Sequence, residues 1–329
     1  MKLRALVVHS PTFEREKLEQ YASKLEEIKD ESVWTKRITL APTPREVSLD
    51  KVVEVADEHK EILWGMVHLP AKDPRTEKIP EYLGGDNVYA SVLVKDPDQA
   101  ELVKKVYREL DPEKASRFSL TFNDYFVVSP YFPSGTGDVA VPSLSASLLY
   151  VEEFRSGNEV RTLARADEMA RIYSKQIGVK YLGLDVSLSP WRSESVGSLI
   201  ENMSGKRVFD ISQISVVHGI NQRIFRASVI AKVNAIGFSE LMLPVAEDEV
   251  LTQRASEGSL KLRDLIAMSF VCVAGLDMVA VKEELIAPLV RDMLAVYYVK
   301  RRPVGMRVIP TQGGDVVLKN FGRVVETQP

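Results

Sequence analysis

The sequence predicts an α/β fold, built on a parallel or mixed sheet that is either doubly wound or closed as a barrel. Short β-branched apolar runs alternate with longer segments of helical period along the 329 residues, which is typical of repeated βα units. Several of these runs are almost wholly apolar, so we expect strands that are covered on both faces. No sequence repeat recurs at a fixed period, which argues against a solenoid.

The individual elements follow from these patterns. About ten strands are expected, and in chain order they cover residues 3–9, 34–40, 65–69, 88–94, 118–122, 181–188, 238–245, 278–281, 305–309 and 315–318. Helices fill the intervals, the longest at 159–175, 211–234 and 283–300. The clearest helix start is Asp96-Pro97-Asp98-Gln99, where aspartate can cap the helix, proline suits its first position and glutamine can close a capping box.

The chain shows no long linker, so residues 1–329 are expected to form a single α/β barrel domain. The segment richest in loop-forming residues is 129–143, with three prolines and two glycines. A loop of this kind in a compact domain is often a lid or a binding loop. Because the alternation of strands and helices continues on both sides of it, we do not expect a domain boundary there.

Composition excludes several classes of protein. There are 43 basic against 46 acidic residues, a formal charge of −3, and the pI of about 6.0 argues against nucleic-acid partners. The one cysteine excludes a disulfide framework and a multi-thiolate metal site. No apolar stretch reaches the about 18 residues of a membrane span or has the form of a signal peptide, so a cytoplasmic protein with no membrane partner is expected. Base rates favour a homo-oligomer.

Common functional motifs are absent from the sequence. It contains no G-x-G-x-x-G or G-x-x-x-x-G-K-[ST] loop for nucleotides and no G-x-S-x-G nucleophile elbow. The four histidines are far apart and form no metal-binding pair. The sequence therefore identifies no metal and no cofactor.

Carboxylates near strand ends are the strongest candidates for chemistry, because ligands of βα folds usually bind at the carboxyl ends of strands. Asp185 and Ser187 lie near the end of one predicted strand, and Arg192 follows them. Glu247 and Asp248 follow another predicted strand. Two acids with a base nearby could bind a divalent metal or transfer a proton.

Each candidate also has a structural interpretation. Asp248 precedes a predicted helix and would cap it, whereas Asp185 lies among apolar neighbours and needs a partner if it is buried. His9 and His68 end two predicted strands and are interpreted first as packed, hydrogen-bonded core histidines. Cys272 ends an apolar helical run, where the helix dipole does not stabilise a thiolate, so it is interpreted as structural.

Four segments carry a resemblance to a known family. They are YLGLDVSLSP at 181–190, SVGSLIE at 195–201, GFSELMLPVAED at 237–248 and VCVAGLD at 271–277. In this order, with SPYFP at 129–133 and a C-terminal strand containing Arg307, the chain resembles the domain-of-unknown-function family 711. The resemblance implies a barrel of about ten strands surrounded by helices, like that of pyruvate formate-lyase and the anaerobic ribonucleotide reductases.

The resemblance does not carry radical chemistry with it. A glycyl-radical enzyme needs a C-terminal glycine loop of the R-V-x-G-Y kind, but here Gly322 precedes Arg323 and Val324, so no glycyl radical is expected. The chain also reads VHGINQR at 217–223, where the family tends to be rich in glycine and threonine. A ligand site at that helix start would depend on His218 and Arg223 for its polarity.

Two functional hypotheses remain open. In the first, the protein binds or converts a small polar metabolite, with Asp185 and Glu247 as catalytic carboxylates. The side chains expected to orient the ligand are Ser187, Arg192, Asp248 and His218. In the second, the protein is a non-catalytic metabolite-binding regulator or an assembly scaffold on a degenerate barrel, since fold does not determine function. An open, charged pocket would favour the first hypothesis, and a filled centre with a broad apolar outer patch would favour the second.

Overall fold

A computed structural model describes residues 1–273 and 276–329, and its centre is a nine-stranded mixed sheet. Along the sheet the strands follow the order β7-β6-β1-β2-β3-β4-β5-β9-β8. Their bounds are β1 Lys2–Ser10, β2 Val33–Leu40, β3 Ile62–Pro70, β4 Val88–Val94, β5 Phe118–Phe122, β6 Ser143–Leu149, β7 Lys180–Asp185, β8 Leu276–Lys282 and β9 Val304–Thr311. A separate hairpin pairs β10 (Val316–Leu318) with β11 (Gly322–Val324).

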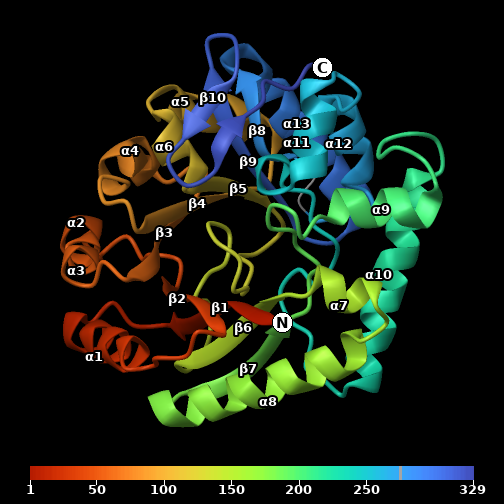
Figure 1. Cartoon of the computed structure of the whole chain (residues 1–329). Coiled ribbons are helices and arrows are strands. Elements are labelled where there is room, and N and C mark those ends of the chain that lie inside the picture. The colour runs from red at the N-terminus through yellow and green to blue at the C-terminus, as the bar shows by residue number, and fades with distance from the viewer. Residues whose placement is uncertain (274–275) are drawn as a thin grey trace.

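The helices lie outside the curved sheet (Figure 1). Their bounds are α1 Arg15–Glu26, α2 Leu49–Val53, α3 Val55–Glu58, α4 Ile79–Tyr82, α5 Ala100–Arg108, α6 Pro112–Ser116, α7 Val151–Arg155, α8 Glu159–Ile177, α9 Val196–Ser204, α10 Gln213–Ile230, α11 Glu249–Ser256, α12 Leu262–Met268 and α13 Ile286–Lys300. No helix among the described residues is both long and apolar enough to cross a membrane.

The sheet contains strands of two directions. Strands β1 to β5 are mutually parallel. At one flank β6 and β7 run against β1, and at the other β9 and β8 run against β5. One end of the sheet therefore combines the amino ends of the central strands with the carboxyl ends of the flanking strands, and the other end combines the reverse set. The rule that ligands bind at carboxyl ends does not single out one end of this sheet.

The two faces of the sheet differ in polarity, as β6 shows. Leu144, Ala146 and Leu148 belong to the main hydrophobic core. Between them the serines point to the concave face, where Ser145 Oγ lies 2.6 Å from His9 Nε2. A strand whose faces have different surroundings is expected to alternate in this way.

The segment 129–137 crosses the concave face of the sheet (Figure 1). Gly137 N donates to Leu40 O at 2.7 Å, and Thr39 Oγ1 donates to Gly135 O at 2.8 Å. A Cβ atom on Gly135 would lie 1.9 Å from Ser129 O, so only glycine fits this tight turn. The loop expected to be a lid or a binding loop is thus packed inside the curve of the sheet.

Most of the predicted strands are confirmed, and three predictions need correction. The first concerns 238–245, which is not a strand; without it and without 315–318, and with β6 added, nine strands form the main sheet where ten were predicted. Gly237 and Ser239 have φ angles of 65° and 52°, which break the extended backbone. The segment bonds instead to residues just outside the two edge strands: Met242 N donates to Leu188 O, after β7, at 3.0 Å, and Val273 N, before β8, donates to Leu241 O at 3.2 Å.

The second correction concerns the predicted strand 315–318, which corresponds to β10 in the separate hairpin. The third is β6, which the sequence did not predict and which pairs with β1 and β7. Its serines, which face the polar concave side, continue the polar composition of the loop before it. The predicted turn at Ala274 and Gly275 lies outside the described residues.

Candidate functional site

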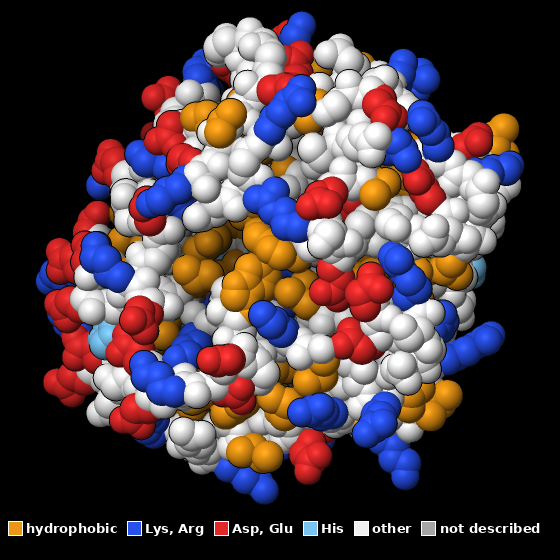
Figure 2. Space-filling model, in the orientation of Figure 1, with side chains coloured by type: hydrophobic (Ala, Val, Ile, Leu, Met, Phe, Trp, Pro, Cys, Tyr) orange, Lys and Arg blue, Asp and Glu red, His pale blue; other side chains and the backbone are white. Residues whose placement is uncertain are grey.

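A cavity of about 400 Å³ lies inside the curve of the sheet, within the size range of small-molecule sites. Figure 2 shows hydrophobic side chains gathered in a hollow near the centre of one face, inside the ring of strands in Figure 1. The central strands contribute residues from their amino-terminal halves, namely Arg4, Thr35, Leu63, Tyr89 and Ser119. The crossing loop contributes 131–134, and β9 contributes 305–307.

Aromatic rings form much of the cavity wall. Trp34 and Trp191 meet edge to face with ring centroids 4.7 Å apart, and Phe321 lies 6.0 Å from Trp191. Tyr89 and Phe132, which also line the cavity, have ring centroids 5.4 Å apart. Such walls offer flat apolar surface to a ligand.

Four charged side chains form one network beside these rings. Glu247, only 3% exposed, accepts from Arg4 Nη2 at 2.5 Å and from Arg307 Nη2 at 2.7 Å. Arg307 also donates through Nε to Asp277 Oδ1 at 2.6 Å. All four residues line the cavity. Their charges are paired two against two, which is how proteins tolerate buried ions.

The two carboxyl groups of this network have different proton affinities. Burial alone would raise the pKa of Glu247, but Arg4 and Arg307 together hold it below its usual value. Burial raises the pKa of Asp277, and the single arginine beside it only partly offsets that effect. Because functional sites often contain titratable groups with opposite shifts, Asp277 is the carboxyl group better suited to carry a proton.

Asp185 is buried at the end of β7 and joins three segments of the chain. Oδ1 accepts from Ser187 Oγ at 2.6 Å and from Ser239 N at 2.9 Å. Oδ2 accepts from Ser129 Oγ at 2.8 Å and from Phe238 N at 2.9 Å. Burial raises the pKa of Asp185 despite these bonds. Among the described residues that line the cavity, neither Asp185 nor Ser187 is present.

Asp248 and Arg192 lie behind and beside the cavity. Asp248 Oδ1 accepts from Val250 N at 2.9 Å, and Oδ2 accepts from Gly197 N at 3.0 Å. It therefore caps α11 and also holds the start of α9, which confirms the structural interpretation of this residue. Arg192 lies at the rim, where its Nη2 donates to Asn320 O at 3.2 Å.

His218 lies away from these residues, in the second turn of α10. α10 begins at Gln213, close to the predicted start at 211, so the segment 217–223 lies inside the helix and not at the helix start that the resemblance implied. His218 lines a second hollow of about 670 Å³ with Lys300 and Arg302. Both of these cations are paired with Glu240, at 2.6 and 2.7 Å, so the second hollow offers fewer uncommitted charges than the central cavity.

Arg223, which could have supplied polarity at that helix start, is paired with Glu159. Its Nε lies 2.6 Å from Glu159 Oε1 and its Nη2 lies 2.8 Å from Glu159 Oε2. This pair fastens α10 to α8. The Nε and Nη2 edge of the guanidinium is therefore occupied by this carboxylate.

The two strand-end histidines are packed as the structural interpretation expects. His9 Nδ1 lies 2.8 Å from Thr136 O, and His68 Nδ1 lies 2.8 Å from Ser91 Oγ. Burial lowers the pKa of each to about 4. Cys272 is buried, but the prediction that it ends a helix is wrong, because α12 ends at Met268 and Cys272 lies beyond it.

Sequence reasoning missed the arginines of the cavity. Arg4 and Arg307 each interrupt an apolar run within a strand, and Arg37 follows Thr35 and Lys36 in β2. A buried cation needs a partner as much as a buried acid does, so this interruption was the available signal. The search for acids at strand ends did not use it.

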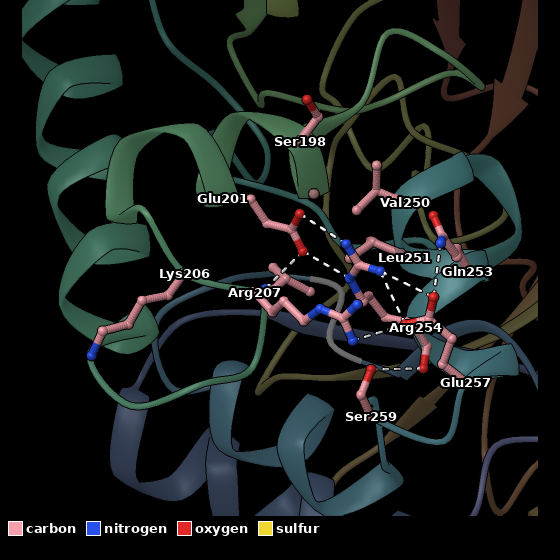
Figure 3. A network of polar contacts seen from close by, with 12 residues as sticks. Ser198, Glu201, Lys206, Arg207, Val250, Leu251, Gln253, Arg254, Glu257 and Ser259 are labelled. Carbon is pink, nitrogen blue, oxygen red and sulfur yellow. Dashed lines mark hydrogen bonds and ion pairs between the residues drawn. The ribbon is translucent and has the colours of Figure 1, made fainter.

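A second arginine–carboxylate network lies outside the cavity and joins α9 to α11 (Figure 3). Arg254 donates to the Glu201 carboxylate through Nε at 2.8 Å and through Nη2 at 3.0 Å. Its Nη1 donates to Glu257 Oε2 at 3.0 Å, and Arg207 reaches the same oxygen at 3.3 Å. None of these four residues is among the described residues that line the central cavity.

Within the described part of the chain, no group of three or more histidine, cysteine, aspartate or glutamate side chains could hold a metal ion. The cavity residues are arginines, carboxylates, hydroxyls and aromatic rings. This set suits direct recognition of an organic molecule by hydrogen bonds and apolar contact.

Comparison with known proteins gives a consistent family. The model of the family described as "Uncharacterised ACR (DUF711)" matches residues 150–318. A UPF0210 protein of Pyrobaculum aerophilum is 26% identical over 255 residues, which cover 69% of this chain and 56% of that protein. A UPF0210 protein of Streptococcus sanguinis is 30% identical over 168 residues, 49% of this chain and 37% of that protein. The chain thus spans about half, or less, of the length of these relatives.

Proposed function

The chain belongs to the DUF711 family, and on that premise we propose that it binds a small polar metabolite in the central cavity. One observation carries this proposal: the network of Arg4, Glu247, Arg307 and Asp277 is buried and borders an open cavity. Buried ion networks contribute little to stability compared with apolar packing, so a network placed at a cavity suggests a functional reason.

If the bound metabolite is converted, we assign the proton-transfer role to the carboxylates of this network. Asp277 starts as the carboxylate paired with Arg307, and it would take up the proton during the reaction because burial raises its pKa. Glu247 would stay ionised and fix the two arginines against the ligand. Asp185 and Ser187 would act as positioning residues, since their bonds hold the crossing loop and the segment after β7 in place.

We also propose that the curved sheet is a barrel of the pyruvate formate-lyase kind. The support is the arrangement of five parallel central strands with flanking strands of opposite direction. The segment 238–245, which bonds to Leu188 after β7 and to Val273 before β8, would occupy the position of a tenth strand. The proposal for the ligand site does not depend on closure of the barrel.

The test blocks the cavity from one side. Gly305 lines it, and a Cβ atom there would meet only Ser134 Oγ, at 3.5 Å. Gly305→Leu therefore fills the space with little backbone strain. Gly219→Leu is the matched control, because a Cβ atom on that exposed glycine of α10 would have nothing within 4 Å.

The readout is a thermal-shift screen against a panel of small polar metabolites. We expect at least one compound to raise the Tm of wild type and of Gly219→Leu but not that of Gly305→Leu. A panel without hits on wild type, or hits that persist in Gly305→Leu, would contradict the proposal.

A scaffold role is the second candidate, and one surface favours it. Along α10, Phe225, Val229 and Ile230 are 60–66% exposed, and contiguous exposed apolar surface often marks an interaction site. A homo-oligomer formed through α10 would appear in sedimentation velocity and would dissociate in Phe225→Asp. A wild-type monomer at all accessible concentrations would contradict it.

A further inference from the structure

Arg37 of β2 is a buried cation that lacks a carboxylate. It is only 8% exposed and it lines the central cavity. Its Nε donates to Thr35 Oγ1 at 2.9 Å and its Nη1 donates to Pro130 O at 3.2 Å. No hydrogen bond from its Nη2 is found among the described residues. The outer edge of this guanidinium is therefore unused on the cavity side.

Arg117 shows what a structurally committed arginine looks like in the same sheet. It is also 8% exposed and has no carboxylate partner among the described residues. Its guanidinium, however, donates to three main-chain carbonyls, those of Leu83, Gly85 and Val88, at 2.5–3.0 Å. Arg117 is not among the described residues that line the cavity. The contrast indicates that Arg37 is not buried merely to satisfy main-chain carbonyls.

The balance of charges in the cavity also indicates that Arg37 is available to a ligand. Glu247 and Asp277 are matched by Arg4 and Arg307, so Arg37 leaves one positive charge without a counter-ion among the described residues of the cavity. Asp86, which also lines the cavity, is exposed and lies 3.6 Å from Lys319. Solvent and this lysine screen its charge, so it does not balance the charge of Arg37. A monovalent anion would balance the cavity.

The charge of Arg37 and the aromatic rings near it indicate which other groups a ligand of this cavity carries. Burial lowers the pKa of Arg37 to about 10, which still leaves it protonated at neutral pH. Phe132 lies beneath its guanidinium, with the ring centroid 5.0 Å away, and the indole rings of Trp34 and Trp191 also line the cavity. A flat apolar group can pack against such rings.

We propose that this cavity selects a small monocarboxylate, whose carboxylate pairs with the free edge of Arg37 and whose flat apolar part packs against the aromatic rings. A planar guanidinium edge matches the two oxygens of a carboxylate. The inference rests on the proposed function, because it names the class of ligand for the same cavity.

The experiment uses benzoate as the probe and benzamide as its uncharged counterpart of the same shape. Binding is followed through tryptophan fluorescence, since Trp34 and Trp191 lie in the wall. Loss of one charge-assisted pair weakens binding roughly ten- to hundredfold. We therefore expect benzoate to bind wild type at least about tenfold more tightly than benzamide, and Arg37→Gln to remove that preference.

Arg117→Gln is the matched control, and it should keep the preference for benzoate even if it lowers the Tm. Phenyl phosphate, which carries a second charge, should bind more weakly than benzoate. Arg37→Lys, which keeps the charge and loses the planar edge, should retain only part of the preference.

Equal affinity of wild type for benzoate and benzamide, tighter binding of phenyl phosphate, or no saturable binding of benzoate would each overturn the inference. The comparison of the two probes on wild type stands even if Arg37→Gln does not fold. The proposed function fails separately, when the metabolite panel gives no hit that Gly305→Leu abolishes.

Discussion

The network around Arg254 and the network around Glu247 use the same residue types in different surroundings. In the outer network the side chains of Glu201 and Glu257 are 21% and 32% exposed, so water reaches both carboxylates. The central arginines are alike, since Arg254 and Arg307 are both 10% exposed, but in the cavity network Glu247 is only 3% exposed. The outer network connects α9 with α11, whereas the inner network lines the central cavity together with Arg37.

The difference shows why counting ion pairs does not locate function. Exposed pairs gain little free energy and lose some of it to screening. Buried pairs are costly to desolvate and costly to break, so their position carries more information than their number. Of these two networks, only the buried one borders a cavity that a ligand can fill.

The largest expected effect comes from breaking the inner network. Glu247→Gln leaves Arg4 and Arg307 buried with one fewer counter-charge, and we expect a loss of about 3–5 kcal/mol in the free energy of unfolding. Urea denaturation at pH 7 measures it. Glu249→Gln, two residues along and exposed, is the control and should stay within about 0.5 kcal/mol of wild type. A Glu247→Gln protein as stable as its control would show that the inner network is not buried as described.

The two buried histidines of the concave face predict that the free energy of unfolding depends on pH. His9 and His68 have folded pKa values of about 4 against 6.5 when unfolded. Between these values the unfolded chain binds protons that the folded chain does not, so stability falls as the pH drops from 6.5 to 4. Each histidine accounts for about 3 kcal/mol of that fall.

The measurement is the free energy of unfolding of wild type and His68→Asn at pH 7, 5.5 and 4.5. Because the variant lacks one of the two groups, the stability gap between the two proteins should narrow as the pH falls. Parallel pH profiles would mean that His68 is protonated in the folded protein or is not buried.

A smaller effect is expected from breaking the outer network. Arg254→Gln removes the bidentate contact with Glu201, which should cost about 1–2 kcal/mol. The metabolite that stabilises wild type should still raise the Tm of this variant by the same amount. If the metabolite no longer raises the Tm of this variant, the outer network contributes to the ligand site and the two networks do not differ in function.

The smallest expected effect is a difference between the two networks in how salt changes the destabilisation by a substitution. In 1 M NaCl the destabilisation by Arg254→Gln should shrink by a few tenths of a kcal/mol, because its partners are within reach of counter-ions. The destabilisation by Glu247→Gln should not change, since its partners are buried. Denaturation curves at low and high salt give both values, and an equal salt response would contradict the difference in burial.

Much of the fold could be predicted from hydrophobic period alone. The predicted strands at 88–94 and 118–122 coincide with β4 and β5, and the longest helices were found within a few residues. The strand β6 was missed because period cannot tell a serine on a polar concave face from a serine in a loop. The segment 238–245 was mistaken for a strand because its apolar composition does not reveal the positive φ angles near its start.

The site was predicted less well, for a physical reason. Glu247 was found because an acid stood at the end of an apolar run, and it lines the cavity. Asp185 gave the same signal, yet its oxygens are occupied by serines and main-chain amides. The arginines that complete the cavity stand inside strands, and the sequence does not show that five strands place their amino ends at the site.

The most direct test is a crystal structure of the protein with the compound that stabilises it most in the metabolite panel. We predict that the compound lies in the central cavity, in contact with Arg37 or the Glu247 network and packed against Trp34 or Trp191. Density for the compound in the hollow beside His218, or anywhere outside the sheet, would contradict the account.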